Sequence, residues 1–377
     1  MTRLRFYPTL EALPTQCDAL FAATAKQNFA LDRTWFGNLV DNGLEADKEP
    51  LFGVFTAGAD PIALIPLQQN LQERSLGSLT NIYSCLYSPL IPKDGIPPEI
   101  VRQLGREFGH FCRDWPVVRV DCLPAEWFGL ASFCAGLSDA RVAVRRFDHF
   151  GNWYEPVTNQ SWDSYIASRP GPLRELLRRK SRRSQLVNRL EFEIIRTPAG
   201  LSQGIEAFER VYRRSWKSAE PFSRFNPGLM QTAAARGALR LGICWKGTLP
   251  VAVQFWILSD SGNATIMKLA HDKECAALSP GTLLTAAMIK TLIEDDAVQE
   301  LDFGRGDDRY KRLWVKERRQ RIGLILASRH RLRGLAIIAR HDLGRALKQV
   351  REMSALRAPP RDAPGPSHHF CQNTGKI

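Results

Sequence analysis

The sequence lacks the features that mark a membrane or secreted protein. None of its 377 residues lies in an unbroken apolar run near the ~18 to 20 residues that a membrane-spanning helix needs. The N-terminal stretch MTRLRFYPTLEALP has no long apolar segment followed by a small-residue cleavage site, so no secretory signal is expected. Its eight cysteines are scattered and form no Cys-x-x-Cys pair. We therefore expect a cytoplasmic protein with reduced thiols, without a disulfide framework and without a metal site.

Length and charge limit the remaining possibilities. A chain of 377 residues is too long for one ordinary core and fits two domains, and its 44% apolar content indicates a folded protein. The formal net charge of +13 predicts an anionic partner, which leaves nucleic acid, anionic lipid and phosphorylated cofactors open. The basic residues gather in three segments, at 174–189, 316–321 and 329–361.

The two halves of the chain carry the same order of expected elements. Each has strand-like runs, then an amphipathic helix, a strand, a short helix and a last strand. This repetition predicts two copies of one supersecondary plan in a mixed α/β protein. For the first half the strands are expected at 51–57, 61–70, 79–90, 117–123 and 141–147, with helices at 96–114 and 126–137. For the second half the strands are expected at 239–246, 249–260, 263–272, 298–304 and 321–328, with helices at 280–296 and 307–315.

A basic helical insert separates the halves, and a basic segment follows them. The insert is expected to begin at Ser161, a plausible N-cap, to break at Pro170-Gly171-Pro172 and to include a later amphipathic helix at 204–217. We expect residues 331–358 to form a basic amphipathic helix that packs on the second domain or, alternatively, contacts an anionic membrane at its inner face. The predicted divisions are 1–155, 156–330, the helix 331–358 and a disordered tail at 359–377.

The start of the helix at residue 280 has the composition of an anion site. Ser279 is a preferred N-cap, Pro280 suits the first helical position, and Gly281 has no side chain to keep a ligand away. The free N–H groups of Gly281, Thr282 and Leu283 would then point at a ligand along the positive end of the helix dipole, which suits a diphosphate. A capped helix that binds nothing has the same local sequence. The expected position at the carboxyl edge of the sheet favours the ligand.

A second motif follows, and the two together resemble a known superfamily. Asp302-Phe303-Gly304-Arg305-Gly306 is followed by Tyr310-Lys311 and Trp314. In this order and spacing, the motifs resemble the GNAT acyltransferase superfamily and, within it, the CelD/BcsL-type acetyltransferases; the Fem-type aminoacyl transferases are wider relatives. The resemblance covers about residues 156–330 and implies two tandem GNAT-like domains, the first of them degenerate. The chain departs from the usual R/Q-x-x-G-x-G/A loop, because it offers Gly281 alone.

The resemblance implies where an acyl-CoA donor would bind. In GNAT proteins a backbone N–H at a splay in the fourth strand bonds the thioester carbonyl, which corresponds here to Met267–Ala270. The implied cofactor-binding residues are Leu269, Ala270, Ser279, Gly281 and Thr282.

The resemblance also implies catalytic and substrate-binding roles. Tyr310 is the candidate general acid that protonates the leaving thiolate, Lys311 would hold an acceptor phosphate or developing negative charge, and Asp302 would orient an acceptor or act as base. Arg305 and Trp216 are candidate acceptor contacts, and Lys217 and His271-Asp272 are weaker candidates. Asp307 is expected to cap the short helix.

Three functions fit this sequence. The first is an acyl-CoA-dependent N- or O-acyltransferase that acts directly, in a ternary complex, on a sugar or amino sugar of an envelope or extracellular polysaccharide, because no Cys or Ser lies in a nucleophile setting. The second is a Fem-like transferase that takes its acyl group from aminoacyl-tRNA through the basic segment Arg178–Arg183. The third is a non-enzymatic binder of polyanions or membrane surfaces. The first domain is expected to lack a cofactor site, because its equivalent helix opens with Pro97-Pro98-Glu99, and to shape the acceptor cleft.

Overall fold

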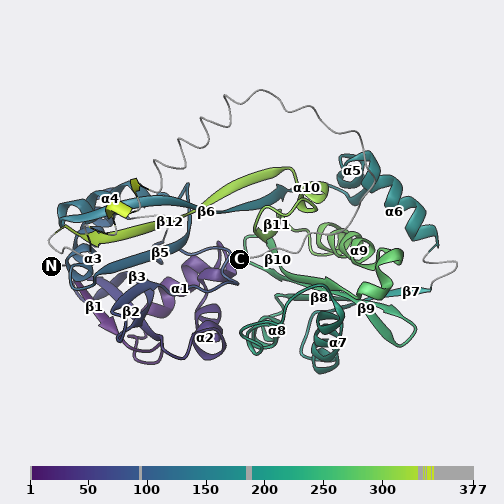
Figure 1. Cartoon of the computed structure of the whole chain (residues 1–377), viewed down its shortest axis with the longest axis horizontal. Coiled ribbons are helices and arrows are strands. Elements are labelled where there is room, and N and C mark those ends of the chain that lie inside the picture. Colours follow the sequence, from purple (N-terminus) through teal and green to yellow (C-terminus); the bar gives the residue numbers. More distant parts are fainter. Residues whose placement is uncertain are drawn as a thin grey trace.

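The computed structural model describes residues 2–92, 96–183, 189–329, 334, 336, 338–340 and 342–343. Within these residues twelve strands form one mixed sheet in the order β1-β2-β3-β4-β5-β12-β6-β11-β10-β9-β8-β7. Helices cover both faces of this sheet (Figure 1). The mixed α/β fold is therefore confirmed, and the two halves of the chain lie side by side along the sheet.

The first half consists of a meander and a parallel strand. β1 to β4 pair as antiparallel neighbours, and β4 then pairs with β5 in parallel, which requires a crossover. That crossover is α3, an amphipathic helix with buried residues on one face. The elements are β1 (Thr2–Tyr7), α1 (Cys17–Ala25), α2 (Arg33–Asn42), β2 (Glu49–Ala57), β3 (Asp60–Asn70), β4 (Ser75–Ser78), α3 (Pro98–Cys112), β5 (Val117–Pro124) and α4 (Leu130–Asp139).

The second half follows the same plan. β7 to β10 are antiparallel neighbours, β10 pairs with β11 in parallel, and α9 is the crossover between them. In Figure 1, α5, α6 and α9 lie on one side of these strands and α7 and α8 on the other. The elements are α5 (Trp162–Ala167), α6 (Gly171–Arg183), β7 (Leu190–Ile195), α7 (Leu201–Arg214), α8 (Phe225–Ala235), β8 (Leu239–Lys246), β9 (Leu249–Leu258), β10 (Asn263–His271), η3 (Lys273–Leu278), α9 (Pro280–Glu294), β11 (Glu300–Arg305) and α10 (Lys311–Trp314).

Two long strands join the halves. β6 (Val142–Pro156) pairs with β12 (Glu317–Ser328) along its length and with β11 near its end, while β12 also pairs with β5. The last strand that the structure describes, β12, therefore lies between β5 and β6. The division at residue 155 stays a prediction, and it falls inside a strand that serves both halves.

A buried asparagine on β6 bonds both halves of this junction. The Asn152 amide nitrogen donates to Asp302 Oδ1 at 2.6 Å and to the Gly304 carbonyl at 3.0 Å. Its amide oxygen accepts from Arg319 Nε at 2.6 Å and from Arg321 Nη2 at 3.0 Å. Asn152 is fully buried, so these bonds satisfy polar groups that water does not reach. The junction is thus held by a polar network inside an apolar sheet.

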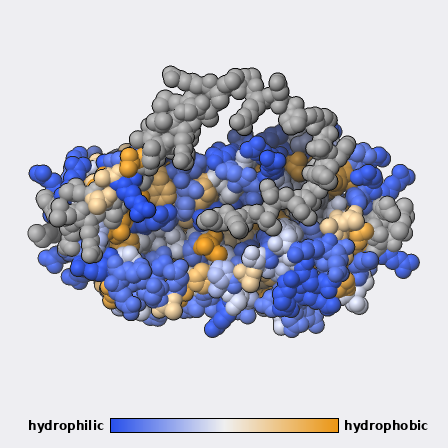
Figure 2. All heavy atoms as spheres, in the orientation of Figure 1, coloured by the Kyte–Doolittle hydropathy of each residue, from blue (hydrophilic) through white to orange (hydrophobic). Residues whose placement is uncertain are grey.

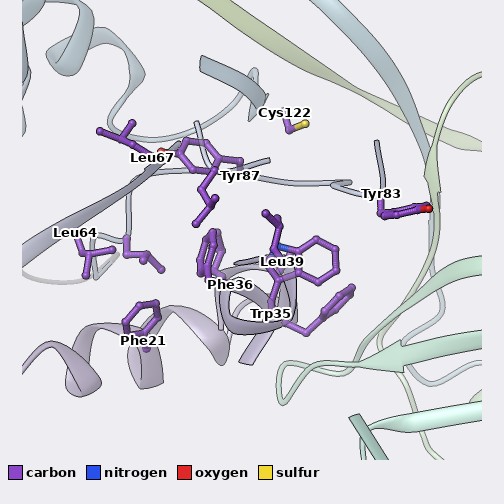
Figure 3. Close-up of a cluster of buried hydrophobic side chains, with 14 of the residues drawn as sticks. Phe21, Trp35, Phe36, Leu39, Leu64, Leu67, Tyr83, Tyr87 and Cys122 are labelled. Carbon is purple, nitrogen blue, oxygen red and sulfur yellow. The ribbon is translucent and has the colours of Figure 1, made fainter. Parts of the chain in front are cut away.

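The larger apolar core also crosses between the halves. Phe21, Trp35 and Phe36 of α1 and α2 pack in one cluster with residues of α7, α8 and the second-half strands (Figure 3). The rings of Trp35 and Phe225 meet edge to face with centroids 5.5 Å apart. A second cluster fills the opposite face, under α5, α6 and α9. The hydrophobic contact between α2 and α8 therefore fixes the two halves against each other.

One expected strand of the first half is wrong. Residues 79–90 form a loop with an isolated bridge from Leu64 to Leu90, and the short strand β4 precedes them. Buried apolar residues in this loop recur every third or fourth position, at Leu79, Tyr83, Tyr87 and Leu90, whereas a half-buried strand buries every second residue. The other expected strands and helices of both halves are present with shifted ends.

The helical insert is confirmed where it is described. The Ser161 hydroxyl accepts from the Ser164 N–H at 3.2 Å, and α5 ends before Pro170. The expected helix 331–358 lies mostly outside the described residues, and the tail 359–377 lies wholly outside them. At residue 342 Asp342 pairs with Arg145 of β6 at 2.7 Å, and the packing of the whole helix on the second domain stays a prediction. None of the described helices has the length and apolar character to cross a bilayer.

Candidate functional site

β10 and β11 diverge in the middle of the second half. Their parallel pairing runs from Asn263–Glu300 only to Thr265–Asp302, while β10 continues to His271 along β9. A bulge between Ile266 and Lys268 marks the point of divergence. In an antiparallel ladder alternate residues bond the neighbouring strand, so the other N–H groups of residues 267–271 face the gap that β11 leaves. This gap contains the predicted carbonyl-binding segment with Leu269 and Ala270.

A tight turn ends β11. Asp302 Oδ1 accepts from the Gly304 N–H at 2.6 Å, and Asp302 Oδ2 accepts from Arg319 Nη2 at 2.5 Å. Gly304 has a φ of +64°, and a Cβ there would meet the Ile266 carbonyl oxygen at 3.0 Å. Glycine is therefore required both for the backbone conformation and for the close approach to β10. Asp302 is buried and bonds Asn152, Gly304 and Arg319, so it positions the turn.

Lys311 closes the loop that follows. Its Nζ donates to the Arg305 carbonyl at 2.6 Å and to the Gly306 carbonyl at 3.1 Å, and it lies 3.6 Å from Asp308 Oδ2. Burial lowers the pKa of Lys311, partly offset by Asp308. The ammonium group thus holds the loop between β11 and α10 in shape.

Tyr310 lies beside this loop with its ring packed near Phe303, at a centroid distance of 6.4 Å. None of the residues that the structure describes bonds its hydroxyl. Burial, with the charge of Asp308, raises the pKa of the phenol well above its usual range. The group therefore stays protonated, as a proton donor must.

Asp307 does not cap the short helix, so that prediction is wrong. α10 begins at Lys311, and no side chain caps it. Asp307 instead accepts from Trp153 Nε1 at 2.8 Å and from Arg318 Nε at 2.7 Å. The hydrogen bond from Arg318 lowers the pKa of Asp307 to about 2, with a smaller contribution from Trp153. The Asp307 carboxylate, which the local sequence predicts as a helix cap, therefore pairs with Arg318 of β12 instead.

Arg305 lines a cavity shared by both halves. Its guanidinium lies over the Phe150 ring at 4.6 Å and within 3.3 Å of His149 Nε2. The cavity has a volume of about 680 Å³. Its lining includes Lys48, Gln68, Asn81, Arg119, Asp121 and Phe222. Residues of the first half thus line this cavity together with Arg305, and the expectation that the first half shapes the acceptor cleft stays a prediction.

The start of α9 carries unbonded amide donors. Ser279 occupies the N-cap position in the left-handed region, φ 57°, and its side chain makes no capping bond. No described acceptor bonds the N–H groups of Gly281 or Thr282. The prediction of a free N–H at Leu283 is wrong, because this group bonds the Ser279 carbonyl at 3.1 Å in the first turn of the helix. Lys180 of α6 donates to the Ala277 carbonyl at 2.5 Å, which brings a basic helix to the same end of α9. These are donors and charges that suit an anion.

His271 and Trp216 lie next to this helix start. A Cβ at Gly281 would be 3.3 Å from His271 Nδ1, and the His271 and Trp216 rings are 4.5 Å apart. Burial lowers the pKa of His271, partly opposed by Asp272, so the ring is neutral near pH 7. The Asp272 carboxylate accepts hydrogen bonds from Arg214 Nε at 2.5 Å and from the Glu274 N–H at 3.0 Å. Trp216 is 51% exposed and covers the outer side of His271 at the start of α9.

A second group of polar side chains surrounds Glu220 in the α7–α8 loop, and no local motif indicated it. Glu220 Oε1 accepts from Lys268 Nζ at 2.6 Å, and both Glu220 oxygens accept phenol protons, from Tyr212 and Tyr83. Lys268 lies at the β10 bulge, and Tyr83 comes from the first half. Nearby, burial and the charge of Lys268 lower the pKa of Lys217 to about 8. Only folding brings these residues together.

The comparisons with known proteins agree with this geometry. Residues 173–312 match the acetyltransferase (GNAT) domain model, so the chain carries a GNAT-type acetyltransferase domain. FemX has a similar structure, with a TM-score of 0.58 and 9% identity over 86% of this chain and 97% of FemX. The C-terminal domain (DUF2156) of a protein described as a lysylphosphatidylglycerol synthetase, from Agrobacterium fabrum, gives 0.53 and 16% over 86% and 96%.

A tandem GNAT protein from the clavulanic acid biosynthesis pathway gives a TM-score of 0.51 and 12% identity over 86% of this chain and 99% of that one. At these identities the likeness concerns the fold, and it extends over both halves. No curated protein matches the chain. The expected GNAT fold in tandem is therefore confirmed, and the domain supports an acyltransferase.

Proposed function

We propose that the chain is an acyl-CoA-dependent acyltransferase of the CelD/BcsL type. It would transfer an acetyl or longer acyl group directly to an amine or hydroxyl of a sugar or amino sugar used in an envelope or extracellular polysaccharide. The observation that carries the proposal is the divergence of β10 and β11 beside a helix start with unbonded amides. One end of this gap suits a diphosphate and the other a thioester.

The donor would lie between β10 and β11 with its diphosphate at α9. The N–H groups of Gly281 and Thr282 would bond phosphate oxygens, and the helix dipole adds to their attraction. Burial lowers the pKa of His271, so its neutral ring would add no positive charge to the attraction of the diphosphate. The thioester carbonyl would bond a free backbone N–H near Leu269 or Ala270, and this bond strengthens as negative charge develops on the oxygen.

Transfer would then proceed in one ternary complex. The nucleophile attacks the thioester carbon, and the carbon–sulfur bond breaks. Tyr310, kept protonated by burial, would donate its proton to the leaving sulfur. Asp302 and Lys311 would act by holding the loop that carries Tyr310 and Arg305, because their bonds are made within that loop and its sheet neighbours.

A thermal-unfolding assay tests the donor assignment. Acetyl-CoA or a longer acyl-CoA at about 100 times its Kd should stabilise the folded chain by about 2.7 kcal/mol and raise the midpoint of unfolding. Free CoA should give a smaller rise, because it lacks the thioester carbonyl. Unchanged midpoints with acetyl-CoA and with longer acyl-CoAs, all at millimolar concentration, contradict the proposal.

An aminoacyl-tRNA donor is the second candidate, favoured by α6. This helix packs on α9, and its arginines Arg178, Arg179 and Arg182 lie at the surface near the proposed donor site. Reversing the charge of all three should abolish transfer from aminoacyl-tRNA, because phosphate contacts dominate such binding. An acyl-CoA enzyme should lose less than about threefold, since the diphosphate would be held by backbone amides.

A further inference from the structure

Two hydrogen-bond donors face each other in the cavity that Arg305 lines. His149 of β6 accepts the N–H of the buried Cys122 on its Nδ1 at 3.2 Å. A backbone N–H can only donate, so Nδ1 has no hydrogen and Nε2 of the neutral ring has one. Arg305 Nη2 lies 3.3 Å from this Nε2, and a guanidinium group offers no acceptor. The two donors therefore need an acceptor that can lie between them.

The other form of the histidine ring does not remove this conflict. If Nδ1 carried the hydrogen, Nε2 could accept from Arg305, but the N–H of Cys122 would lose its acceptor inside the protein, which is costly. Burial lowers the pKa of His149, and the charge of Asp121, which lies 3.8 Å from Nδ1, opposes this. The charges of Arg305 and Arg119 lower the pKa further, so the ring is neutral near pH 7.

Arg305 is available to a ligand. Its guanidinium lies over the Phe150 ring at 4.6 Å, which leaves the N–H groups at the edge of the guanidinium plane to bond other partners. The side chain is exposed, and within the residues that the structure describes it forms no ion pair with a carboxylate. A carboxylate or phosphate has several acceptor oxygens and carries the opposite charge. Such a group would satisfy both Arg305 and His149.

The cavity around these donors carries an excess of positive charge. Its volume of about 680 Å³ lies within the range of small-molecule sites. Four basic and two acidic side chains are among its described lining residues, and both acids are paired, Glu45 with Lys48 at 2.7 Å and Asp121 with Arg119 at 2.8 Å. Figure 2 shows hydrophobic side chains only in small separate groups on the visible, coloured surface. An anionic ligand therefore suits this cavity better than an apolar one.

The cavity adjoins the loop that carries the proposed proton donor. The Arg305 carbonyl accepts from Lys311 Nζ at 2.6 Å, and Tyr310 directly precedes Lys311. Phe222 of the α7–α8 loop and residues of β4 and β5 also line the cavity. A ligand held by Arg305 would thus contact both halves of the chain beside this loop.

We propose that this cavity binds an oxyanion, a carboxylate or a phosphate, between His149 Nε2 and Arg305, and that the sugar acceptor carries this group. The inference rests on the proposed acyl transfer and narrows its acceptor to an acidic sugar. His149 and Arg305 determine this specificity, because two donors, one of them charged, bind an anionic oxygen more strongly than a neutral hydroxyl. No covalent bond changes at this site, which holds the acceptor while transfer takes place in the gap between β10 and β11.

The first test observes the His149 ring and needs no acyl donor. Nitrogen-15 NMR of histidine-labelled protein shows which ring nitrogen carries a hydrogen, and the absence of the signals in His149→Gln identifies them. The free chain should have this hydrogen on Nε2. Glucuronate and glucose 6-phosphate should each shift the Nε2 signal, and glucose should not. A hydrogen on Nδ1, or a signal that neither acid moves at millimolar concentration, overturns the site. Inorganic phosphate that binds as tightly as glucose 6-phosphate overturns the assignment to a sugar.

Arg305→Met tests the charged donor. Its affinity for glucuronate, followed on the His149 signal, should fall roughly 10- to 100-fold, because a charge-assisted hydrogen bond is lost. Arg312→Met is the matched control, since Arg312 also lies over an aromatic ring, that of Trp153 at 4.9 Å, but does not line the cavity. It should change the affinity less than about twofold. Unchanged affinity in Arg305→Met, or equal losses in both variants, overturns the role of Arg305.

Two substitutions of His149 isolate its donor. His149→Phe and His149→Gln both deprive the Cys122 N–H of the ring nitrogen, but the glutamine amide can still donate near the position of Nε2. Saturation-transfer NMR observes the sugar and therefore serves for both variants. His149→Phe should bind glucuronate roughly tenfold more weakly than the wild-type chain, and His149→Gln should stay within about threefold of it. Equal affinities in the two variants overturn the role of the Nε2 donor.

A last measurement connects the cavity to acyl transfer. With acetyl-CoA, thiol release should show a kcat/KM at least roughly tenfold higher for glucuronate than for glucose, and Arg305→Met should lose this preference. The affinity of this variant for acetyl-CoA should stay unchanged. A chain that binds the acids and acetyl-CoA but transfers equally to both sugars, or to neither, overturns the acidic acceptor. A chain that does not bind acetyl-CoA overturns the proposed function instead, and the NMR results on the cavity remain valid.

Discussion

α3 and α9 occupy the same place in the two halves, since each links a meander to a parallel strand. Their first turns differ. α3 opens with Pro97, Pro98 and the acid Glu99, whereas α9 opens with Pro280 and Gly281 and exposes two unbonded amides. An acid at a helix start stabilises the dipole and repels an anion. The proposed donor site therefore depends on a helix start that the first half does not repeat.

The segments that precede these two helices also differ, because one stays within its own half and the other reaches across to the second half. In the second half, the short helix η3 leads from β10 to α9 within its own half. In the first half, the loop at 79–90 crosses to the second half, where Tyr83 bonds Glu220 and Cys85 lies 3.3 Å from the position a Gly304 Cβ would take. The first half thus contributes Tyr83 and Cys85 to contacts with the second half.

Replacing the candidate acid should have the largest effect. Tyr310→Phe removes the proton donor, so kcat should fall roughly 100- to 10,000-fold while acetyl-CoA binding stays unchanged. The first-half control Tyr87→Phe should change kcat less than about twofold. Steady-state kinetics and calorimetry check both. Full activity of Tyr310→Phe would remove the phenol from the mechanism and favour a non-enzymatic role.

The next largest effect is expected when the start of α9 is given the acid that the start of α3 has. Gly281→Glu places a carboxylate where α3 has one, so acetyl-CoA affinity should fall roughly 100-fold while the fold persists, because an acid at this position favours the helix. Glu99→Gln, the matched change in α3, should leave the affinity unaltered. Equal affinities for all three chains would mean that the diphosphate lies elsewhere.

The shared junction predicts that both halves unfold together. Asn152→Leu leaves the buried Asp302 and Arg321 and the half-buried Arg319 without their common partner, so it should cost about 3 kcal/mol of unfolding free energy. Asn70→Leu, which loses a first-half bond to Asp47 at 2.7 Å, should cost about 1 kcal/mol. Denaturant curves followed by circular dichroism and by tryptophan fluorescence should coincide for both variants, and separate transitions would contradict a shared junction.

The smallest effect is expected at Lys217. Its folded-state pKa of about 8 lies below the usual 10.5, so the unfolded chain binds more protons between these values and stability rises with pH across that window. Lys217→Met removes the cost of burying this charge and should raise stability at about pH 7 by about 1 kcal/mol, with a flatter dependence above about pH 8. Urea midpoints at two pH values measure this, and a less stable variant at pH 7 would show that the ammonium is held favourably.

Strand order and motif position in the second half could be predicted from sequence because they depend on local patterns. The apolar meander, the Ser279-Pro280-Gly281 helix start and the turn after Asp302 each carry their signal within a few residues. The position of β12 between β5 and β6 could not be predicted, because its pairing partners are far away along the chain and no local pattern identifies them.

The misplaced strand at 79–90 and the unnoticed Glu220 have one physical cause. Tyr83 and Tyr87 are buried by contacts with distant elements, and their spacing along the chain does not describe a sheet face. Glu220 likewise acquires its environment from β10, α7 and the first half, which adjoin it only after folding. Asp307 was assigned to a local cap for the same reason, whereas its partners lie on β6 and β12.

Calorimetric titration of the intact chain with acetyl-CoA tests most directly the claim that the second half alone binds the donor. The account predicts a stoichiometry of one per chain, unchanged in Glu99→Gln and weakened at least roughly 100-fold in Gly281→Glu. No heat of binding, two sites per chain, or tight binding to Gly281→Glu would contradict it.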